Sequence, residues 1–309
     1  MKKPATKKPA LKTVPATTTE KRSASDVITD AIIAKLEQGI IPWRRPWNGS
    51  ANAPRNYVTG KAYRGVNLIL LSMAGTEFSS PYFLTFKQIQ DKKGLLKAGS
   101  KSLPVVFWTM FKGEDSETGD ERDVPMMRYY RFFNVEQTNL PVPAITETPL
   151  DFEPLEEAER IITNMPLVPE IRHGAPKAFY SPSLDYVNMP AKELFINAEN
   201  YYNVLFHELA HSTGSIKRLA RKGVTESSYF GSHSYSKEEL VAEVTACFMA
   251  GELGFLPETL ENRGAYIQSW LRALKSKDNR NMIVSAASQA QKAFDYILNR
   301  KPAEMAEAA

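Results

Sequence analysis

The stretch that decides the fold of the second half of this chain is "LFHELAHSTG", residues 205–214. It holds two of only four histidines in 309 residues, His207 and His211, with Glu208 beside the first. Residues four apart share one face of a helix, so both imidazoles can reach one cation while Glu208 leans toward the same space. Gly214 can end such a helix. The spacing therefore predicts a helix that carries an H-E-x-x-H metal motif.

A third protein ligand has to come from another segment, because catalytic zinc sites use three. The metzincin pattern would place a histidine where this chain has Lys217, which excludes that option. The better source is "SKEELVAEVTACF", residues 236–248, where Glu239 and Glu243 have the i, i+4 spacing of the second helix of gluzincins. We assign Glu239 as the ligand and Glu243 as an acid that orients a histidine, and the reverse assignment stays open. Glu238 points about 100° away from Glu239 and is expected in solvent.

A site of this kind binds Zn²⁺ by default, although another divalent ion such as Mn²⁺ would also fit. Glu208 is then expected to act as a general base that takes a proton from a metal-bound water attacking a carbonyl. Tyr229 or Tyr235 could stabilise the resulting oxyanion, and the sequence does not choose between them. We expect metal-dependent peptide hydrolysis, with a protein substrate that the sequence does not identify.

The first half of the chain carries positive charge among aromatic residues. Between residues 43 and 112 there are eleven Lys and Arg against two acids, Glu77 and Asp91. Cations neutralise phosphates, whereas aromatic faces stack on unpaired bases, so this mixture favours single-stranded DNA. The segment "PWRRPW" is its sharpest element, although its tryptophans could equally fill the core. The residues expected to contact DNA on these grounds are Trp43, Arg44, Arg45, Trp47, Lys61, Lys87, Lys93, Lys97 and Lys101.

The fold class predicted from these patterns is α+β. Residues 1–24 form a basic Lys/Pro/Thr arm expected to be disordered, and the last nine residues, 301–309, look like a flexible tail. A helix is readable after the arm, and two β-branched and aromatic strands flank the acidic segment "GEDSETGDERD" as a long hairpin. Four prolines between residues 141 and 154 read as a linker. We therefore expect a DNA-binding domain over residues 25–145 and a mainly helical domain over residues 146–300.

The amino-acid composition indicates the cellular compartment and excludes some kinds of site. The single cysteine, Cys247, excludes an intramolecular disulfide and is typical of the cytoplasm. No apolar run reaches the length of a membrane span, so no membrane partner is expected. The same cysteine count removes zinc sites built on several thiolates.

Several motifs follow one another as in a known family. "ITDAIIAKLEQGIIPWRRPW", "TGKAYRGVN", "LTFKQ", "YYRFFNVEQ", "FHELAHSTG…RL.R" and "EELVAE" resemble the ArdC-type antirestriction proteins of conjugative plasmids from about residue 25 to 298. The N-terminal half is also similar to part of the TraC-type plasmid primases. The resemblance implies a single-stranded-DNA-binding domain followed by a zincin-like metallopeptidase domain. It adds Tyr63, Arg64 and Asn67 to the expected DNA-contacting residues.

The resemblance further implies protection of incoming plasmid DNA from host restriction during conjugation, with action in the recipient cell as one expected setting. Two other functions stay open from the sequence. The protein could coat DNA while its metal site is structural or inactive, or it could be a primase accessory. The region before residue 145 shows no acidic constellation suited to nucleotidyl transfer with two metals, which weakens the primase alternative.

Overall fold

The computed structural model describes residues 22–44, 53–74, 77–114, 121–144, 153–225, 233–255 and 263–301. The expected basic arm and C-terminal tail lie almost wholly outside this part of the chain. So does the segment 145–152, where the boundary between the two expected domains falls. Among the described residues, no helix is both long enough and apolar enough to cross a membrane.

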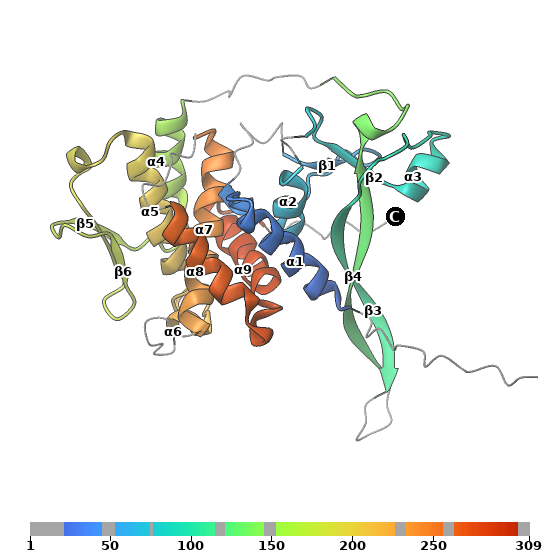
Figure 1. Ribbon diagram of the computed structural model, residues 1–309. Coiled ribbons are helices and arrows are strands. Elements are labelled where there is room, and N and C mark those ends of the chain that lie inside the picture. Colours follow the sequence, from blue (N-terminus) through green and yellow to red (C-terminus); the bar gives the residue numbers. More distant parts are fainter. Residues whose placement is uncertain are drawn as a thin grey trace, which may run out of the picture.

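The N-terminal part combines helices with a four-stranded sheet (Figure 1). Helix α1 (Ala24–Glu37) begins at a capping box formed by Ser23 and Asp26, and Gly39 follows it with a positive φ of 77°. After the short helix η1 (Pro42–Arg44), the chain forms α2 (Gly65–Ser72) and α3 (Phe86–Asp91). The sheet order is β1-β2-β4-β3, with β1 (Arg55–Asn56), β2 (Tyr82–Thr85), β3 (Leu103–Glu114) and β4 (Glu121–Asn134).

The predicted long hairpin is confirmed. Strands β3 and β4 pair antiparallel from Leu103 opposite Phe132 to Glu114 opposite Glu121, and the short helix η3 (Val135–Gln137) follows. Alternate residues of a strand point to opposite faces, so this register decides which side chains share a surface. Figure 1 shows the hairpin extending well beyond the rest of the sheet.

The C-terminal part is mainly helical, as predicted, with one small sheet. Its helices are α4 (Pro154–Asn164), α5 (Ala198–Thr213), α6 (Lys222–Thr225), α7 (His233–Leu253), α8 (Arg263–Lys275) and α9 (Met282–Ile297), with two short helices, η4 (Lys192–Leu194) and η5 (Lys277–Asn279). The sequence patterns did not reveal the sheet, whose order is β5-β7-β6. Its strands are β5 (Glu170–His173), β6 (Phe179–Ser181) and β7 (Tyr186–Met189), and β6 and β7 contact α5.

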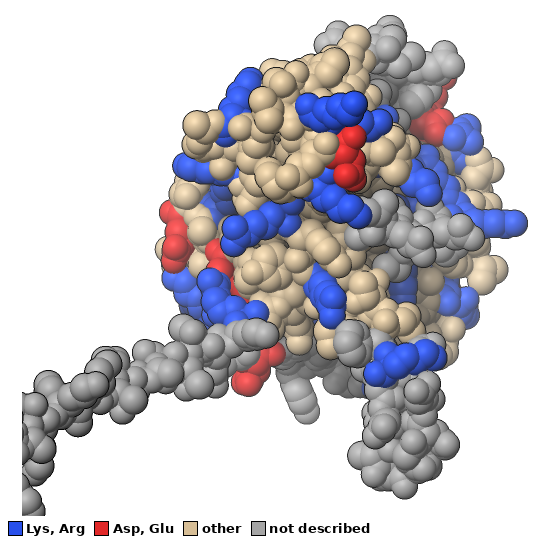
Figure 2. Space-filling view, turned by 90° about the vertical axis from the view of Figure 1, so that its right-hand side faces the viewer, with Lys and Arg blue, Asp and Glu red and all other residues tan. Residues whose placement is uncertain are grey.

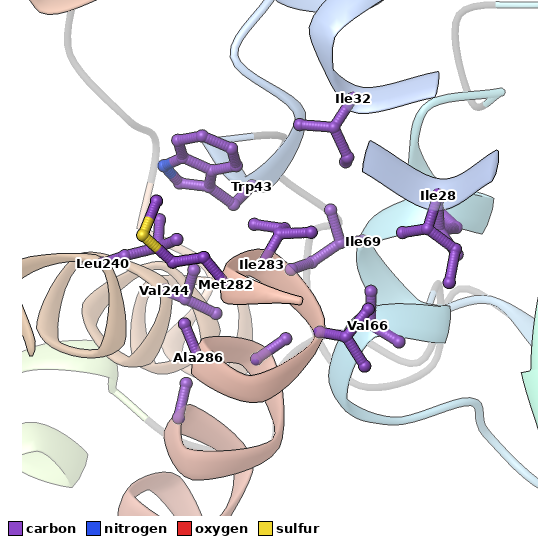
Figure 3. Packing of buried hydrophobic residues seen from close by; sticks show 14 of the residues in the cluster. Ile28, Ile32, Trp43, Val66, Ile69, Leu240, Val244, Met282, Ile283 and Ala286 are labelled. Carbon is purple, nitrogen blue, oxygen red and sulfur yellow. The ribbon is translucent and has the colours of Figure 1, made fainter. Parts of the chain in front are cut away.

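One hydrophobic core joins the two parts of the chain. Figure 3 shows Ile28 and Ile32 of α1, Trp43 of η1, and Val66 and Ile69 of α2 near residues of α7 and α9. The partners from the C-terminal helices include Leu240, Val244, Met282, Ile283 and Ala286. Burial of this shared apolar surface ties the N-terminal helices to the helix that follows the metal motif.

Candidate metal centre

The H-E-x-x-H helix forms where the spacing predicts it. Helix α5 begins after Asn197, whose side chain accepts a hydrogen bond from the Asn200 amide at 2.8 Å, and it ends at Gly214. His207 and His211 lie one turn apart, and their Nε2 atoms are 3.1 Å from each other. The two imidazoles therefore present their distal nitrogens to one common point.

Helix α7 packs against α5 and brings a carboxylate to that point. The Oε2 atom of Glu239 is 3.7 Å from His207 Nε2, and its Oε1 atom is 3.6 Å from His211 Nε2. Ligand atoms of these three residues all lie within 4.8 Å of one another, and no other such trio of His, Cys, Asp or Glu occurs among the described residues. Two imidazoles and one carboxylate form a donor set suited to zinc and to related divalent ions.

Glu208 is buried beside the trio, with 8% of its surface exposed. Burial raises the pKa of its carboxyl group, the positive charge of His211 opposes this, and the negative charge of Glu239 adds to it. An interaction with the backbone of Tyr180, on strand β6, lowers the same pKa. Strand β6, which contacts α5, thus lies beside the carboxylate.

The expectation that Glu238 lies in solvent is wrong. Its side chain is 8% exposed, and Oε1 lies 3.4 Å from Nδ1 of His211. Arg221 donates two hydrogen bonds to the same carboxylate, from Nε to Oε2 at 3.0 Å and from Nη2 to Oε1 at 2.5 Å. The geometric reason is that α6 and the segment before it cover this face of α7 and exclude water from it.

Arg221 also fastens the end of the motif helix. Its Nη2 donates to the Ala210 carbonyl at 2.7 Å, and its Nη1 donates to the Thr213 hydroxyl at 2.6 Å. Gly214 leaves room for this approach, because a Cβ there would lie 3.0 Å from Nη2 of Arg221 and 2.5 Å from a methyl carbon of Val224. A signal for Arg221 was present in the sequence, since it is the last residue of the "RL.R" pattern after the motif.

The charges of this network support each other. Burial alone would lower the pKa of His211, but the hydrogen bond with Glu238 and the charge of Glu239 outweigh it and raise that pKa. For Glu238, burial alone would raise the pKa. Its hydrogen bonds with His211 and Arg221 outweigh burial, so the pKa of Glu238 is lowered. The acid that contacts the second histidine is thus Glu238. Glu243 lies on α7 outside the trio of close ligand atoms, and its assignment as an orienting acid stays a prediction.

The residues expected to contact DNA occupy very different environments. Trp43 is only 2% exposed, its ring packs edge-on against Trp270, and its Nε1 donates to the Tyr266 hydroxyl at 3.2 Å. Tyr63 is buried too, against Phe132. The prediction that these two rings stack on DNA bases is therefore wrong in this structure, because both are enclosed in hydrophobic clusters.

Two polar residues of the expected DNA surface make structural contacts. Arg64 forms an ion pair with Asp295 of α9. The Asn67 side chain donates to the Val106 carbonyl at 2.7 Å and accepts from its amide at 2.8 Å, which fixes α2 to β3. Burial raises the pKa of Asp295, and the charge of Arg64 opposes this.

The expected lysines lie at the surface. Lys61, Lys87, Lys93, Lys97 and Lys101 are all exposed, and Lys97 donates to the Glu136 carbonyl at 2.7 Å. Figure 2, which views the side of the molecule with β2 and α3, shows Lys and Arg scattered over most of this face and few acidic side chains. Arg45, Trp47 and Tyr229 lie outside the described residues, as do the side chains of Arg44 and Tyr235.

Comparison with known families assigns both parts of the chain. Residues 22–133 match the N-terminal domain of anti-restriction factor ArdC, and residues 156–289 match a family of zincin-like metallopeptidases. Crystal structures of the antirestriction protein ArdC from plasmid R388 have the same fold. The metal-free form is 33% identical with a TM-score of 0.70, and the match covers 90% of this chain and 99% of that one.

The chain belongs to the ArdC family. A second ArdC structure from R388 contains Mn(II), is 34% identical with a TM-score of 0.69, and is matched over 89% of this chain and 97% of that one. The protein y4eC of Sinorhizobium fredii (strain NBRC 101917 / NGR234) is 34% identical over 87% of this chain and 90% of its own length. The DNA primase TraC of Escherichia coli is 31% identical over 90% of this chain, which corresponds to 27% of the primase.

Family membership confirms the predicted family and the predicted architecture. The architecture is an ArdC N-terminal domain followed by a zincin-like domain, as the sequence indicated. The zincin-like match spans both helices that carry the candidate ligands. The Mn(II) bound to the R388 protein agrees with a divalent-metal site in this family.

Proposed function

We propose that this protein is an antirestriction factor that binds single-stranded DNA and carries a metal-dependent peptidase site. It would protect incoming plasmid DNA from host restriction during conjugation, in the cytoplasm of the recipient cell. The observation that carries the peptidase half is the convergence of His207, His211 and Glu239 beside the buried Glu208. Membership of the ArdC family supports the antirestriction half.

His207, His211 and Glu239 would hold the divalent ion, with Zn²⁺ or Mn²⁺ as the candidates. When bound, such an ion polarises a substrate carbonyl and lowers the pKa of water. The chain's own contribution is to fix three donors on two packed helices, so the site needs little rearrangement to bind. Glu238 and Arg221 orient the ring of His211 from outside the ligand set.

Glu208 is placed to act as the general base. It is adjacent to the first histidine in the sequence and is 8% exposed, and burial raises the pKa of its carboxyl group, which favours uptake of a proton. We propose that it accepts a proton from the attacking water and later donates it to the leaving amine. Strand β6 lies beside it, so a peptide bound near that strand would present its carbonyl to the same space.

The proposed DNA binding rests on the positive charge of the N-terminal part and on similarity to a DNA primase. Exposed lysines of the N-terminal part, including Lys61, Lys87, Lys93 and Lys101, can neutralise phosphates without reading sequence. Similarity to part of a DNA primase supports contact with DNA. Binding should therefore weaken steeply as salt rises.

The decisive experiment for the peptidase half uses the Glu208→Gln variant. Because glutamine keeps the shape of glutamate, the variant should bind metal and DNA like the wild type. It should lose proteolysis of a denatured protein such as casein, measured with DNA present and absent. Transfer of an unmodified plasmid into a restricting recipient then tests function. If Glu208→Gln protects the plasmid as fully as the wild type, proteolysis is not the mechanism and a DNA-coating role is favoured.

A further inference from the structure

The β3–β4 hairpin carries large side chains that the core does not enclose. Trp108 is 50% exposed, Met110 is 63% exposed and Tyr129 is 39% exposed. In the register, Trp108 lies opposite Met127 and Tyr129 lies opposite Val106, so all three belong to one face of the hairpin. Arg131, opposite Pro104, continues the row and is also exposed. We call Met110, Trp108, Tyr129 and Arg131 the hairpin strip.

The strip borders a packed part of the same face of the hairpin. Val106 and Met127 share its face and pack into the core that joins the two parts of the chain. Successive members of the strip lie at successive levels of the ladder, roughly 7 Å apart along the strands. Trp108 and Tyr129 are diagonal neighbours on adjacent strands, so their rings form two nearby platforms on a fixed backbone. Exposed aromatic groups held in this way mark an interaction surface.

The charge around the strip selects an anionic occupant. Residues 97–112 and 124–135 contain no Asp or Glu, whereas they contain Lys97, Lys101, Lys112, Arg128 and Arg131. Arg131 shares the face of the strip, and Arg128, opposite Phe107, lies on the other face of the hairpin. The sequence between these two stretches, residues 113–123, holds six acids: Glu114, Asp115, Glu117, Asp120, Glu121 and Asp123. The positive charge of the two strand segments themselves therefore favours an anion over the base of the hairpin.

We propose that the hairpin strip is the surface on which unpaired bases of single-stranded DNA stack, with Arg131 and Lys101 contacting the phosphates. This inference rests on the proposed binding of single-stranded DNA and gives it a location. Sheets that display exposed aromatic rings between cations bind single strands in this way, because every base has a face that can stack. A duplex would hide those faces, so the strip discriminates against it.

The test is a titration of a labelled oligothymidylate into the full-length protein, followed by fluorescence anisotropy. Trp108→Ala and Tyr129→Ala should each weaken binding by between about fivefold and about one hundredfold, the range for loss of one stacked base. Both side chains are exposed, so the melting temperatures should stay close to that of the wild type. Phe86→Ala on α3 is the matched control, because Phe86 is also 50% exposed and lies beside Lys87.

A second readout reports stacking directly. Oligothymidylate should quench the fluorescence of the wild type, and the quenching should be smaller in Trp108→Phe. Trp43 and Trp270 are buried, and Trp47 is present in both proteins, so the difference between the two reports on Trp108. Wild-type protein that binds no oligothymidylate would overturn the proposed DNA binding itself. Wild-type binding that survives both alanine variants, or that falls equally in Phe86→Ala, would overturn the hairpin strip alone. Trp108→Ala could also lose plasmid protection while its affinity for DNA stays unchanged. That result would assign the hairpin strip to a protein partner and would overturn the proposal that DNA bases stack on it.

Discussion

The Nδ1 atom of His211 lies 3.4 Å from a carboxylate oxygen of Glu238, a residue with 8% of its side chain exposed. This contact joins the two helices of the candidate site at a point that is not a ligand atom. It leaves Nε2 of the same ring facing His207 and Glu239. The carboxylate therefore selects the ring orientation in which His211 can bind a metal.

Replacing Glu238 by glutamine tests that role. The variant should bind Zn²⁺ about 10- to 100-fold more weakly, the usual cost of losing a partner that orients a ligand. Competition with a chromophoric chelator measures this affinity on folded protein. Glu252→Gln, on the same helix but paired with Arg300, is the control and should bind like the wild type. Equal affinity in both variants would show that the contact does not position His211.

The Asp185 carboxylate supports the small sheet beside the site. It accepts hydrogen bonds from Arg218 at 2.7 Å, Tyr180 at 2.9 Å and Lys217 at 3.0 Å. Burial alone would raise its pKa, but these bonds outweigh burial and lower the pKa to about 2. Because the folded-state pKa is lowered, the stabilisation is present above the usual pKa and is lost as pH falls through about 2.

Asp185→Asn should therefore lower the free energy of unfolding by about 2 kcal/mol at neutral pH. Asparagine suits the position because residue 185 has a positive φ of 54°. The difference from the wild type should shrink below about pH 4, as measured by urea unfolding across pH. A difference that is constant over this range would mean that the carboxylate charge contributes nothing.

Trp43 should matter for stability rather than for DNA. Trp43→Ala should lower the free energy of unfolding by about 3 to 5 kcal/mol, because it empties a buried site between α1, α7 and α8. Trp43→Phe should cost less, since it keeps most of the apolar volume. Affinity of the folded Trp43→Phe protein for single-stranded DNA should equal that of the wild type. If Trp43→Phe bound single-stranded DNA more weakly while its thermal stability stayed unchanged, Trp43 would have to contact DNA after all.

The sequence predicted what local spacing determines. The i, i+4 histidines predicted the motif helix, which the structure shows as α5, and β-branched and aromatic runs located the hairpin. Local spacing could not predict the tertiary contacts. Glu238 is hidden by the segment that carries Arg221, and periodicity along α7 contains no information about that cover. Trp43 and Trp108 both stand near basic residues in the sequence, yet Trp43 fills the joint core and Trp108 projects from β3, because tertiary packing covers only the first.

The central claim is that Glu239, with His207 and His211, binds a divalent ion. Isothermal titration of metal-depleted protein with Zn²⁺, and metal content after dialysis, test it most directly when the wild type is compared with Glu239→Gln and Glu243→Gln. We predict one ion per chain in the wild type, an affinity loss of more than about 100-fold in Glu239→Gln, and a loss of at most about 100-fold in Glu243→Gln, as for an acid that only orients a ligand. Full binding by Glu239→Gln, together with loss in Glu243→Gln, would contradict the account.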